Sequence, residues 1–292
     1  MPHLRIGKIA YSNLFPIFYM LERECECFGY EFIEGVPSTL NRLLRSGEID
    51  VSPSSSIEYL RSQNIYTLID GHSLSSQGPV GSILLLSTLP IEKLEGKKIL
   101  TSSQSETSIA LLSIILKKFY KIQCTMTPTD KPVDSLLTKG EAFLLIGDDA
   151  LKAKKKVTGF TPFLTLPSTS HGPRGGGDRW GGYIYDLGEL WYKNTGLHCV
   201  FALWIARKDF SPDKDKLLER FIRDLDKSKR LAVENLDNIA HALRHLLLSR
   251  HSLDVTEEEL VSYWKGISFD FKEEHKKGLE LFRRYSEELG LL

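Results

Sequence analysis

The stretch YEFIEGVPSTLNRLLRSGEIDV, residues 30–51, decides the fold because it holds a strand, a helix and a second strand in succession. Residues 30–34 predict the first strand. The following residues, with Leu40, Leu43 and Leu44 at helical spacing, predict a capped amphipathic helix that ends at Gly47. Residues 49–51 predict the second strand. This order is a βαβ unit, and the strands of such a unit are parallel.

A short apolar run precedes this unit at residues 4–10 and predicts a buried strand, after which Pro16 limits how the chain continues. Asn13 therefore follows the carboxyl end of a strand. In open α/β sheets, ligands bind outside these ends, where helix N-termini leave backbone N–H groups unpaired. The segment Tyr11-Ser12-Asn13 is thus a candidate for binding a small anion, and a simple turn cap is the alternative.

A cluster of serines, Ser54-Ser55-Ser56, follows the second strand of the unit. Because the strands are parallel, this cluster is expected near Asn13. One serine is expected to cap the next helix, with Glu58 completing the cap. The other two hydroxyls are then available to a ligand.

Further hydroxyls lie at two later element boundaries. Residues 78–82 lead into the apolar run 83–87, and Ser105 precedes the apolar run 109–116. Ser105 is a good N-cap, so the N–H groups of Thr107 and Ser108 are expected to point outward at the positive end of a helix dipole. A carboxylate suits that position. An ordinary cap satisfied by its own serine is the alternative.

Composition indicates a soluble chain of two lobes. The chain has 292 residues with 41% hydrophobic content, enough for a sizeable core and more than one domain usually contains. Its 38 basic and 38 acidic residues give a formal net charge of zero, which excludes a global electrostatic footprint for nucleic acid. The basic run at 152–156 is expected to be a solvated helix end. The partner is therefore expected to be a small molecule.

Several features bear on compartment and metals. The N-terminus has no basic stretch followed by a long apolar core, which favours the cytoplasm. The run 109–116 is too short to span a membrane.

The irregularly spaced cysteines fit neither a disulfide framework nor a four-cysteine zinc site and are expected to be reduced. They are Cys25, Cys27, Cys124 and Cys199. His241 and His245 have metal-ligand spacing without the accompanying glutamate of a zincin, so no metal is expected.

Linked blocks along the chain carry a resemblance to a known family. They include Tyr11-x-Asn13-x-x-Pro16, Gly35-x-Pro37-x-x-Leu40-Asn41, the segment 47–59, Ser76-x-Gly78-x-Val80-x-Ser82, Ser105-x-Thr107-Ser108, the segment 146–151 and the segment 185–197. In this order they resemble the chorismate dehydratases of the futalosine route to menaquinone, a periplasmic-binding-protein-like group that works in the cytoplasm. The resemblance spans residues 4 to about 207 and covers the C-terminal helices only by general character.

The resemblance implies an α/β fold of the periplasmic-binding-protein-like type II, with a ligand cleft between two lobes and a helical C-terminal tail. Lobe 1 is expected at 1–88 and 203–292, and lobe 2 at 89–202, with residues 200–206 as a strand buried on both faces. The tail is expected to be helical throughout from residue 214. Tyr263 and Trp264 are expected in a core or interface rather than in a ligand platform.

The implied activity is a lyase reaction, the loss of water from chorismate to give 3-[(1-carboxyvinyl)oxy]benzoate, with no redox change and no cofactor. The implied partner is chorismate, a small dicarboxylate, and neither nucleic acid nor a membrane is implied. Three alternatives stay open: the sister enzyme that forms 1,4-dihydroxy-6-naphthoate, a non-catalytic small-anion solute-binding protein, and the sensory lobe of a transcription regulator.

The implied site draws on both lobes. The expected catalytic residues are Asn13 and Ser82, and the expected substrate-binding residues are Tyr11, Ser55, Ser56, Thr107, Ser108, Gly147 and Asp148. No histidine lies beside these residues, and the candidate bases near them are few: Glu58, Asp148 and Asp149. One hypothesis therefore makes the substrate's own enolpyruvyl carboxylate the base, while the protein holds the reactive conformer. Asp148 is the reserve candidate.

Two departures from the family pattern are visible. Residues 166–183 look like a glycine-rich insertion, expected as a mobile surface loop or, alternatively, as a lid whose Arg174 or Arg179 reaches a carboxylate. His198 stands where a proline is expected and should alter only the local turn.

Overall fold

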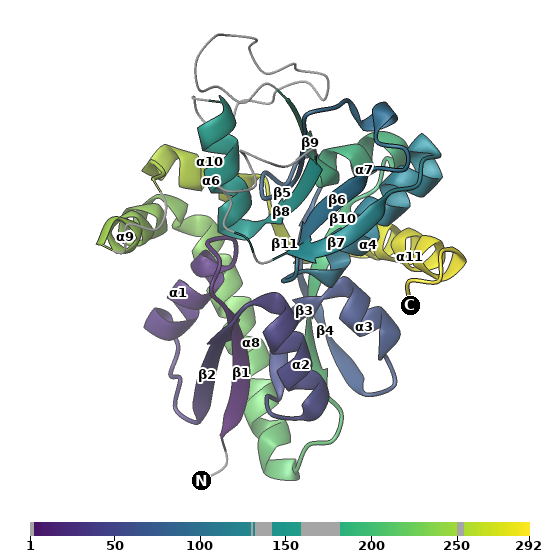
Figure 1. The fold of residues 1–292 in the computed structure, drawn as a ribbon. Coiled ribbons are helices and arrows are strands. Elements are labelled where there is room, and N and C mark those ends of the chain that lie inside the picture. Colours follow the sequence, from purple (N-terminus) through teal and green to yellow (C-terminus); the bar gives the residue numbers. More distant parts are fainter. Residues whose placement is uncertain (1–2, 130, 132–141, 159–181, 250–253) are drawn as a thin grey trace. The chain divides into compact units, whose positions relative to one another are not determined.

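The computed structural model describes residues 3–129, 131, 142–158, 182–249 and 254–292, and the chain divides into two compact units. Unit 1 comprises residues 1–74 and 200–272, and unit 2 comprises residues 75–199 and 273–292. Each unit is an α/β structure with its own sheet (Figure 1). Residues 166–181 of the glycine-rich insertion, including Arg174 and Arg179, lie outside the described residues.

Unit 1 is built on a six-stranded sheet of order β11-β4-β10-β3-β1-β2. Its strands are β1 (Leu4–Ile9), β2 (Tyr30–Gly35), β3 (Val51–Ser55), β4 (Tyr66–Ser76), β10 (Cys199–Arg207) and β11 (Ser268–Phe271). β1 runs parallel to both β2 and β3, which confirms the predicted βαβ unit (Figure 1). β10 is antiparallel to β3 and buried along nearly its whole length, as expected for a central strand.

Six helices among the described residues belong to unit 1: α1 (Phe15–Glu24), α2 (Pro37–Ser46), α3 (Ser56–Arg61), α8 (Pro212–Glu234), α9 (Leu236–Ser249) and α10 (Glu257–Lys265). The α2 helix ends at Gly47, whose φ of 78° is left-handed, as predicted. Phe18 of α1 and Phe221 of α8 both pack on Trp204 of β10, each with ring centroids 5.6 Å apart. One apolar layer therefore joins α1 and α8 to the sheet.

Unit 2 is built on a five-stranded sheet of order β7-β6-β8-β5-β9. Its strands are β5 (Ile83–Ser87), β6 (Lys98–Ser102), β7 (Thr125–Thr129), β8 (Ala142–Ile146) and β9 (Tyr183–Asp186). β6 is parallel to β7 and β8, whereas β5 is antiparallel to β8 and β9. The described helical segments are η1 (Ile91–Lys93), α4 (Glu106–Ile114), the π-helix η2 (Ile115–Tyr120), α6 (Gly147–Thr158), α7 (Leu187–Thr195) and α11 (Glu273–Glu288).

The unit boundaries differ from the expected lobe boundaries of 1–88, 89–202 and 203–292 in three places: residues 75–88 and 273–292 belong to unit 2, and residues 200–202 belong to unit 1. β5 belongs to unit 2 because its ladder bonds go to β8 and β9. The C-terminal α11 also belongs to unit 2, because Phe282 packs edge-on against the buried Trp191, with ring centroids 6.2 Å apart. The tail is helical in large part, but β11 interrupts it and completes the sheet of unit 1.

His198 has a larger role than the local turn predicted for it. Its ring lies 4.3 Å from that of His275 on α11, and its carbonyl accepts a hydrogen bond of 3.1 Å from Trp191 Nε1. A Cβ on Gly278 would lie 2.0 Å from the same carbonyl oxygen. This close approach requires glycine, so α11 is seated on the segment that follows α7.

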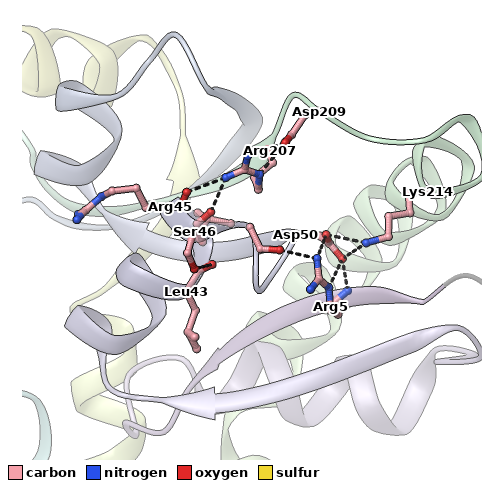
Figure 2. A network of polar contacts seen from close by, with 10 residues as sticks. Arg5, Leu43, Arg45, Ser46, Asp50, Arg207, Asp209 and Lys214 are labelled. Atoms are coloured by element: carbon pink, nitrogen blue, oxygen red, sulfur yellow. Dashed lines mark hydrogen bonds and ion pairs between the residues drawn. The ribbon is translucent and has the colours of Figure 1, made fainter.

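A charged network stabilises unit 1 near the start of β1 (Figure 2). Asp50 accepts hydrogen bonds from the Arg5 backbone (2.8 Å), from the Arg5 guanidinium (2.8 and 3.1 Å) and from Lys214 Nζ (2.8 Å to each oxygen). Beside it, Arg207 donates to the carbonyls of Leu44 and Arg45 at the C-terminus of α2. Burial opposes ionisation of Asp50, but the bonds from Arg5 and Lys214 outweigh it and lower the pKa of the carboxyl.

No helix within the described ranges is long and apolar enough to cross a membrane. Tyr263 and Trp264 are 2% and 1% exposed, which confirms the predicted core role.

Candidate functional site

Asn13 lies in the loop between β1 and α1, beyond the carboxyl end of the strand. Its side chain is 9% exposed, and its Oδ1 has no hydrogen-bond partner among the described residues. Trp264 Nε1 donates a 2.8 Å hydrogen bond to the carbonyl of Ser12, which fixes the backbone of this loop. A buried amide oxygen without a partner costs free energy, so its retention is typical of a group that meets a ligand.

The serine cluster lies at the same edge of the sheet. The parallel register pairs Ile6 with Val51, so the carboxyl ends of β1 and β3 reach this edge together. Ser55 caps α3 by accepting the Glu58 N–H at 3.4 Å, as predicted for one of the three serines. Ser56 donates a 2.6 Å hydrogen bond to the Val200 carbonyl. The hydroxyls expected to bind a carboxylate therefore already have partners within the fold.

One residue of this region has a role that the sequence reasoning missed. Asn41 of α2 donates to Ser55 Oγ at 2.9 Å and accepts the Ser55 N–H at 3.3 Å, so its amide fixes Ser55 from both sides. The spacing of Asn41 after Pro37, within a family block, was the available signal for this role. Ser54, the first serine of the predicted cluster, is fully buried, and its Oγ has no hydrogen-bond partner within the described part of the chain.

The carboxylate of Glu58 does not complete the helix cap, contrary to expectation. It is 0% exposed and accepts hydrogen bonds from Arg45, at 3.1 Å to Nε, and from Tyr66 Oη, at 2.6 Å. Burial and the neighbouring Glu58 raise the pKa of Tyr66 well above its ordinary value, so the phenol stays a donor. Because its acceptor sites are directed at these partners, Glu58 is a poor candidate for a base.

In unit 2 the structure brings three predicted residues together. Ser82 precedes β5, Gly147 follows β8, and these strands are antiparallel with Ile83 opposite Ile146. The Gly147 N–H donates a 2.8 Å hydrogen bond to the Ser82 carbonyl, and Asp148 lies in the first turn of α6. Ser82 is 2% exposed.

Thr107 and Ser108 lie in the first turn of α4, which follows β6. Because β6 is parallel to β8, this turn and Gly147 lie at the same edge of the five-stranded sheet. Ser105 is the N-cap, as predicted, and its Oγ accepts the Ser108 N–H at 3.3 Å. The N–H of Ser108, expected to point outward, is therefore satisfied by the cap. Both Thr107 and Ser108 are 2% exposed.

No group of three or more His, Cys, Asp or Glu side chains suited to a metal occurs in the part of the chain that the structure describes. His241 and His245 lie on the exposed surface of α9 with ring centroids 4.5 Å apart, and His241 contacts Glu257 at 3.0 Å. All four cysteines are free thiols.

Comparison with known proteins identifies the family. A family model described as menaquinone biosynthesis matches residues 4–288. This chain belongs to that family. A relative named Chorismate dehydratase, from Thermus thermophilus, is 29% identical over 290 residues, which is 98% of this chain and 95% of the relative. The match covers both units and the C-terminal helices.

Solved structures of the same fold extend beyond this menaquinone biosynthesis family. A Candida albicans protein described as having the generic periplasmic binding protein fold aligns with a TM-score of 0.61 at 12% identity, covering 100% of this chain and 91% of that one. The alkanesulfonate-binding protein SsuA from Xanthomonas axonopodis, bound to MOPS, aligns with a TM-score of 0.67 at 16% identity, covering 100% and 94%. These confirm the predicted periplasmic-binding-protein-like fold. That architecture serves small-molecule binding in SsuA.

Proposed function

We propose that this protein is a chorismate dehydratase, converting chorismate to 3-[(1-carboxyvinyl)oxy]benzoate in the futalosine route to menaquinone. The observation that carries the proposal is the similarity to Chorismate dehydratase over 98% of the chain. The polar strand edges of the two units support it, because a dicarboxylate needs several hydrogen-bond donors and acceptors.

The reaction is an elimination in which two bonds to ring carbons break, while a ring double bond and the O–H bond of the released water form. The C–H bond beside the enolpyruvyl ether breaks, and its electron pair becomes a ring double bond. The neighbouring C–O bond breaks and the hydroxyl group leaves, taking up the proton to form water. Aromatisation of the ring supplies the driving force. The catalyst needs a base, a hydrogen-bonding group near the departing hydroxyl and anchors for two carboxylates.

The enolpyruvyl carboxylate of the substrate serves as the base in this proposal. This assignment is supported by the hydrogen bonds that already engage two buried acids of unit 1. Glu58 is bonded to Arg45 and Tyr66, and Asp50 is bonded to Arg5 and Lys214. Asp148, beside Gly147 in unit 2, is the alternative base. The protein then contributes by holding the reactive conformer, so that an intramolecular proton transfer is favoured.

Asn13 and Ser82 contact the reacting part of the substrate in this proposal. The buried Oδ1 of Asn13 accepts a hydrogen bond from a substrate hydroxyl, which would satisfy its unpaired state. Ser82 donates to the departing hydroxyl group. Tyr11, Ser55 and Ser56 serve one carboxylate, and because the two serine hydroxyls have protein partners, backbone N–H groups carry more of that contact than the predicted hydroxyls. Thr107 and Ser108 serve the other carboxylate, alongside Gly147.

The test is incubation of the purified protein with chorismate in metal-free buffer, followed by mass spectrometry. Loss of one water together with an aromatic absorbance would support the proposal. Chorismate that binds unchanged would indicate a solute-binding protein. Neither binding nor conversion would direct attention to the sister reaction.

Asn13→Ala provides the residue-level test. We expect kcat to fall by at least about ten-fold, because a preorganised polar contact to the reacting centre is lost. Asn235→Ala is the matched control, since Asn235 lies in the same unit and bonds only the Leu231 carbonyl, at 2.8 Å, among the described contacts of its side chain. Near-normal turnover in Asn13→Ala would remove Asn13 from the site.

A further inference from the structure

Asp186, the last residue of β9, binds four backbone N–H groups in unit 2. Oδ1 accepts from Val80 (3.1 Å), Gly188 (2.9 Å) and Glu189 (3.2 Å), and Oδ2 accepts from Gly81 (2.6 Å). The side chain is 8% exposed. Two of the bonds cap α7, as an aspartate at this position commonly does. The other two join it to a segment about a hundred residues earlier in the chain, which an ordinary cap does not require.

All four partners of Asp186 are donors. A protonated acid would place its own hydrogen against one of them, so these hydrogen bonds favour the carboxylate form. Burial raises the pKa of Asp186, while the N–H groups and Lys154 act to lower it. A buried carboxylate in a ring of amides resists displacement, since moving any amide away leaves part of the charge unsatisfied.

Segment 78–81, which Asp186 binds, has a backbone conformation that few residue types adopt. Gly78 and Gly81 have φ values of 106° and 78°, in the region that favours glycine. Ser76 Oγ donates a 2.8 Å hydrogen bond to the Gly78 carbonyl, and a Cβ on Gly188 would lie 2.6 Å from the same oxygen. A chain with two such glycines has many alternative conformations, so it needs external contacts to hold one of them.

Ser82 directly follows segment 78–81. Asp186 fixes the N–H of Gly81, and Gly147 fixes the carbonyl of Ser82. The backbone is therefore held on both sides of Ser82: Asp186 binds the Val80–Gly81 peptide group shortly before it, and the Gly147 N–H binds the peptide group that follows it. We propose that Asp186 is a positioning residue that holds segment 78–81 so that Ser82 meets the substrate, an inference that rests on the proposed function.

Asp186→Asn separates this role from simple helix capping. With its amide oxygen at the Oδ1 position, asparagine keeps the bonds from Gly188, Glu189 and Val80, so the cap is retained. Its amide nitrogen then faces the Gly81 N–H, and the contact next to Ser82 becomes donor against donor. We expect kcat to fall by about ten-fold or more with KM within about two-fold, as for a misplaced reacting group.

Gly188→Ala tests the same positioning without changing the carboxylate. Its methyl group would push on the Gly78 carbonyl, so we expect a fall in kcat of the same order. Glu95→Gln is the matched control, because Glu95 is a carboxylate of unit 2 that also accepts a backbone N–H, from Gln123 at 2.7 Å. Its kcat should equal that of the parent protein.

Amide hydrogen exchange at Gly81 gives a readout that does not depend on turnover. In Asp186→Asn, exchange at Gly81 should accelerate by about ten-fold or more while exchange at Gly188 stays unchanged. Unchanged exchange at Gly81 would overturn the inference, and so would faster exchange with unaltered kcat. A parent protein that does not convert chorismate would instead overturn the proposed function, and exchange at Gly81 would still show whether Asp186 holds the segment.

Discussion

Asp50 in unit 1 and Asp186 in unit 2 are both buried, 3% and 8% exposed, yet they are satisfied in opposite ways. Asp50 is held mainly by the cations of Arg5 and Lys214 (Figure 2). Asp186 is held by four backbone N–H groups. The pKa of Asp50 is accordingly lowered despite its burial, whereas burial dominates at Asp186 and raises its pKa.

Because of this difference, Asp50 contributes mainly to the stability of its unit, whereas Asp186 contributes mainly to the backbone conformation around it. Paired charges stabilise the ionised form, so Asp50 joins β1, β3 and α8 in a way that depends on charge. Backbone amides are fixed to the chain path, so Asp186 determines the conformation of segment 78–81. We therefore expect changes at Asp50 to appear in unfolding measurements and changes at Asp186 to appear first in turnover.

The largest expected effect on stability comes from Asp50→Asn. The free energy of unfolding at neutral pH should fall by about 2–3 kcal/mol, because Arg5 and Lys214 lose a charged partner while partly buried. Denaturant unfolding measures this, and kcat per folded molecule should be unchanged. Asp209→Asn is the control: its carboxylate pairs with Arg207 but is 64% exposed, so the loss should stay below about 1 kcal/mol. Equal losses would show that burial does not distinguish the two pairs.

Asn41→Ala tests whether a neutral group can hold a site segment as Asp186 does. Asn41 is 1% exposed and bonds Ser55 through both amide atoms. Its removal should lower the free energy of unfolding by about 2 kcal/mol, since the Ser55 N–H loses its acceptor in a buried place. Thermal unfolding gives the value, and Asn194→Ala, at a bond to the Leu190 carbonyl within α7, should cost markedly less. A negligible loss would mean that Ser55 is held by its strand alone.

Ser105→Ala compares a hydroxyl cap with the carboxylate cap of Asp186. Loss of the bond to the Ser108 N–H should cost about 1 kcal/mol of stability, the usual value for an N-cap. Ser113→Ala on the same helix removes a bond to the Ile109 carbonyl and a weak 3.5 Å contact with Met126 Sδ, and should be nearly neutral. Chemical denaturation measures the loss of unfolding free energy in each variant, and equal losses would contradict the capping role of Ser105.

The smallest expected effect is a difference in pH dependence. Because the folded pKa of Asp50 is lowered, its contribution is present above the unfolded pKa of about 4 and is lost as pH falls through the folded value. The gap in stability between the parent and Asp50→Asn should therefore shrink in acid. For Asp186 the pKa is raised, so the stability of the parent relative to Asp186→Asn should increase as pH falls. Unfolding curves below about pH 5 measure both, and gaps that change in the same direction would show that one pKa shift has the opposite sign.

Local pattern was sufficient for much of the architecture. The strand and helix of residues 30–46, the glycine stop at Gly47 and the cap at Ser105 are determined by neighbours in sequence, and each is present. β10 was recognisable because a strand buried on both faces is apolar throughout. The short β11 was missed, since its four residues carry too little pattern to be distinguished from the surrounding helices.

The site was less accessible to sequence reasoning. Hydroxyls in a cluster indicate a polar edge, but not which of them the fold already uses. Ser55 and Ser56 are bonded to Asn41 and to the Val200 carbonyl, partners 14 and 144 residues away. The partners of Glu58 likewise come from α2 and β4. No local pattern contains such distant pairings.

By itself the sequence determined the βαβ unit, the helix ends, the polar strand edges and the family. These depend on residue type and short-range spacing, which backbone sterics and burial translate directly into elements. Only the tertiary structure decided that β5 and α11 join unit 2, that Asn13 keeps an unpaired oxygen and that Asp186 reaches Gly81. Those outcomes depend on which distant donors and acceptors meet once the strands pair, and hydrogen bonds are too short-ranged to be specified before the chain has folded.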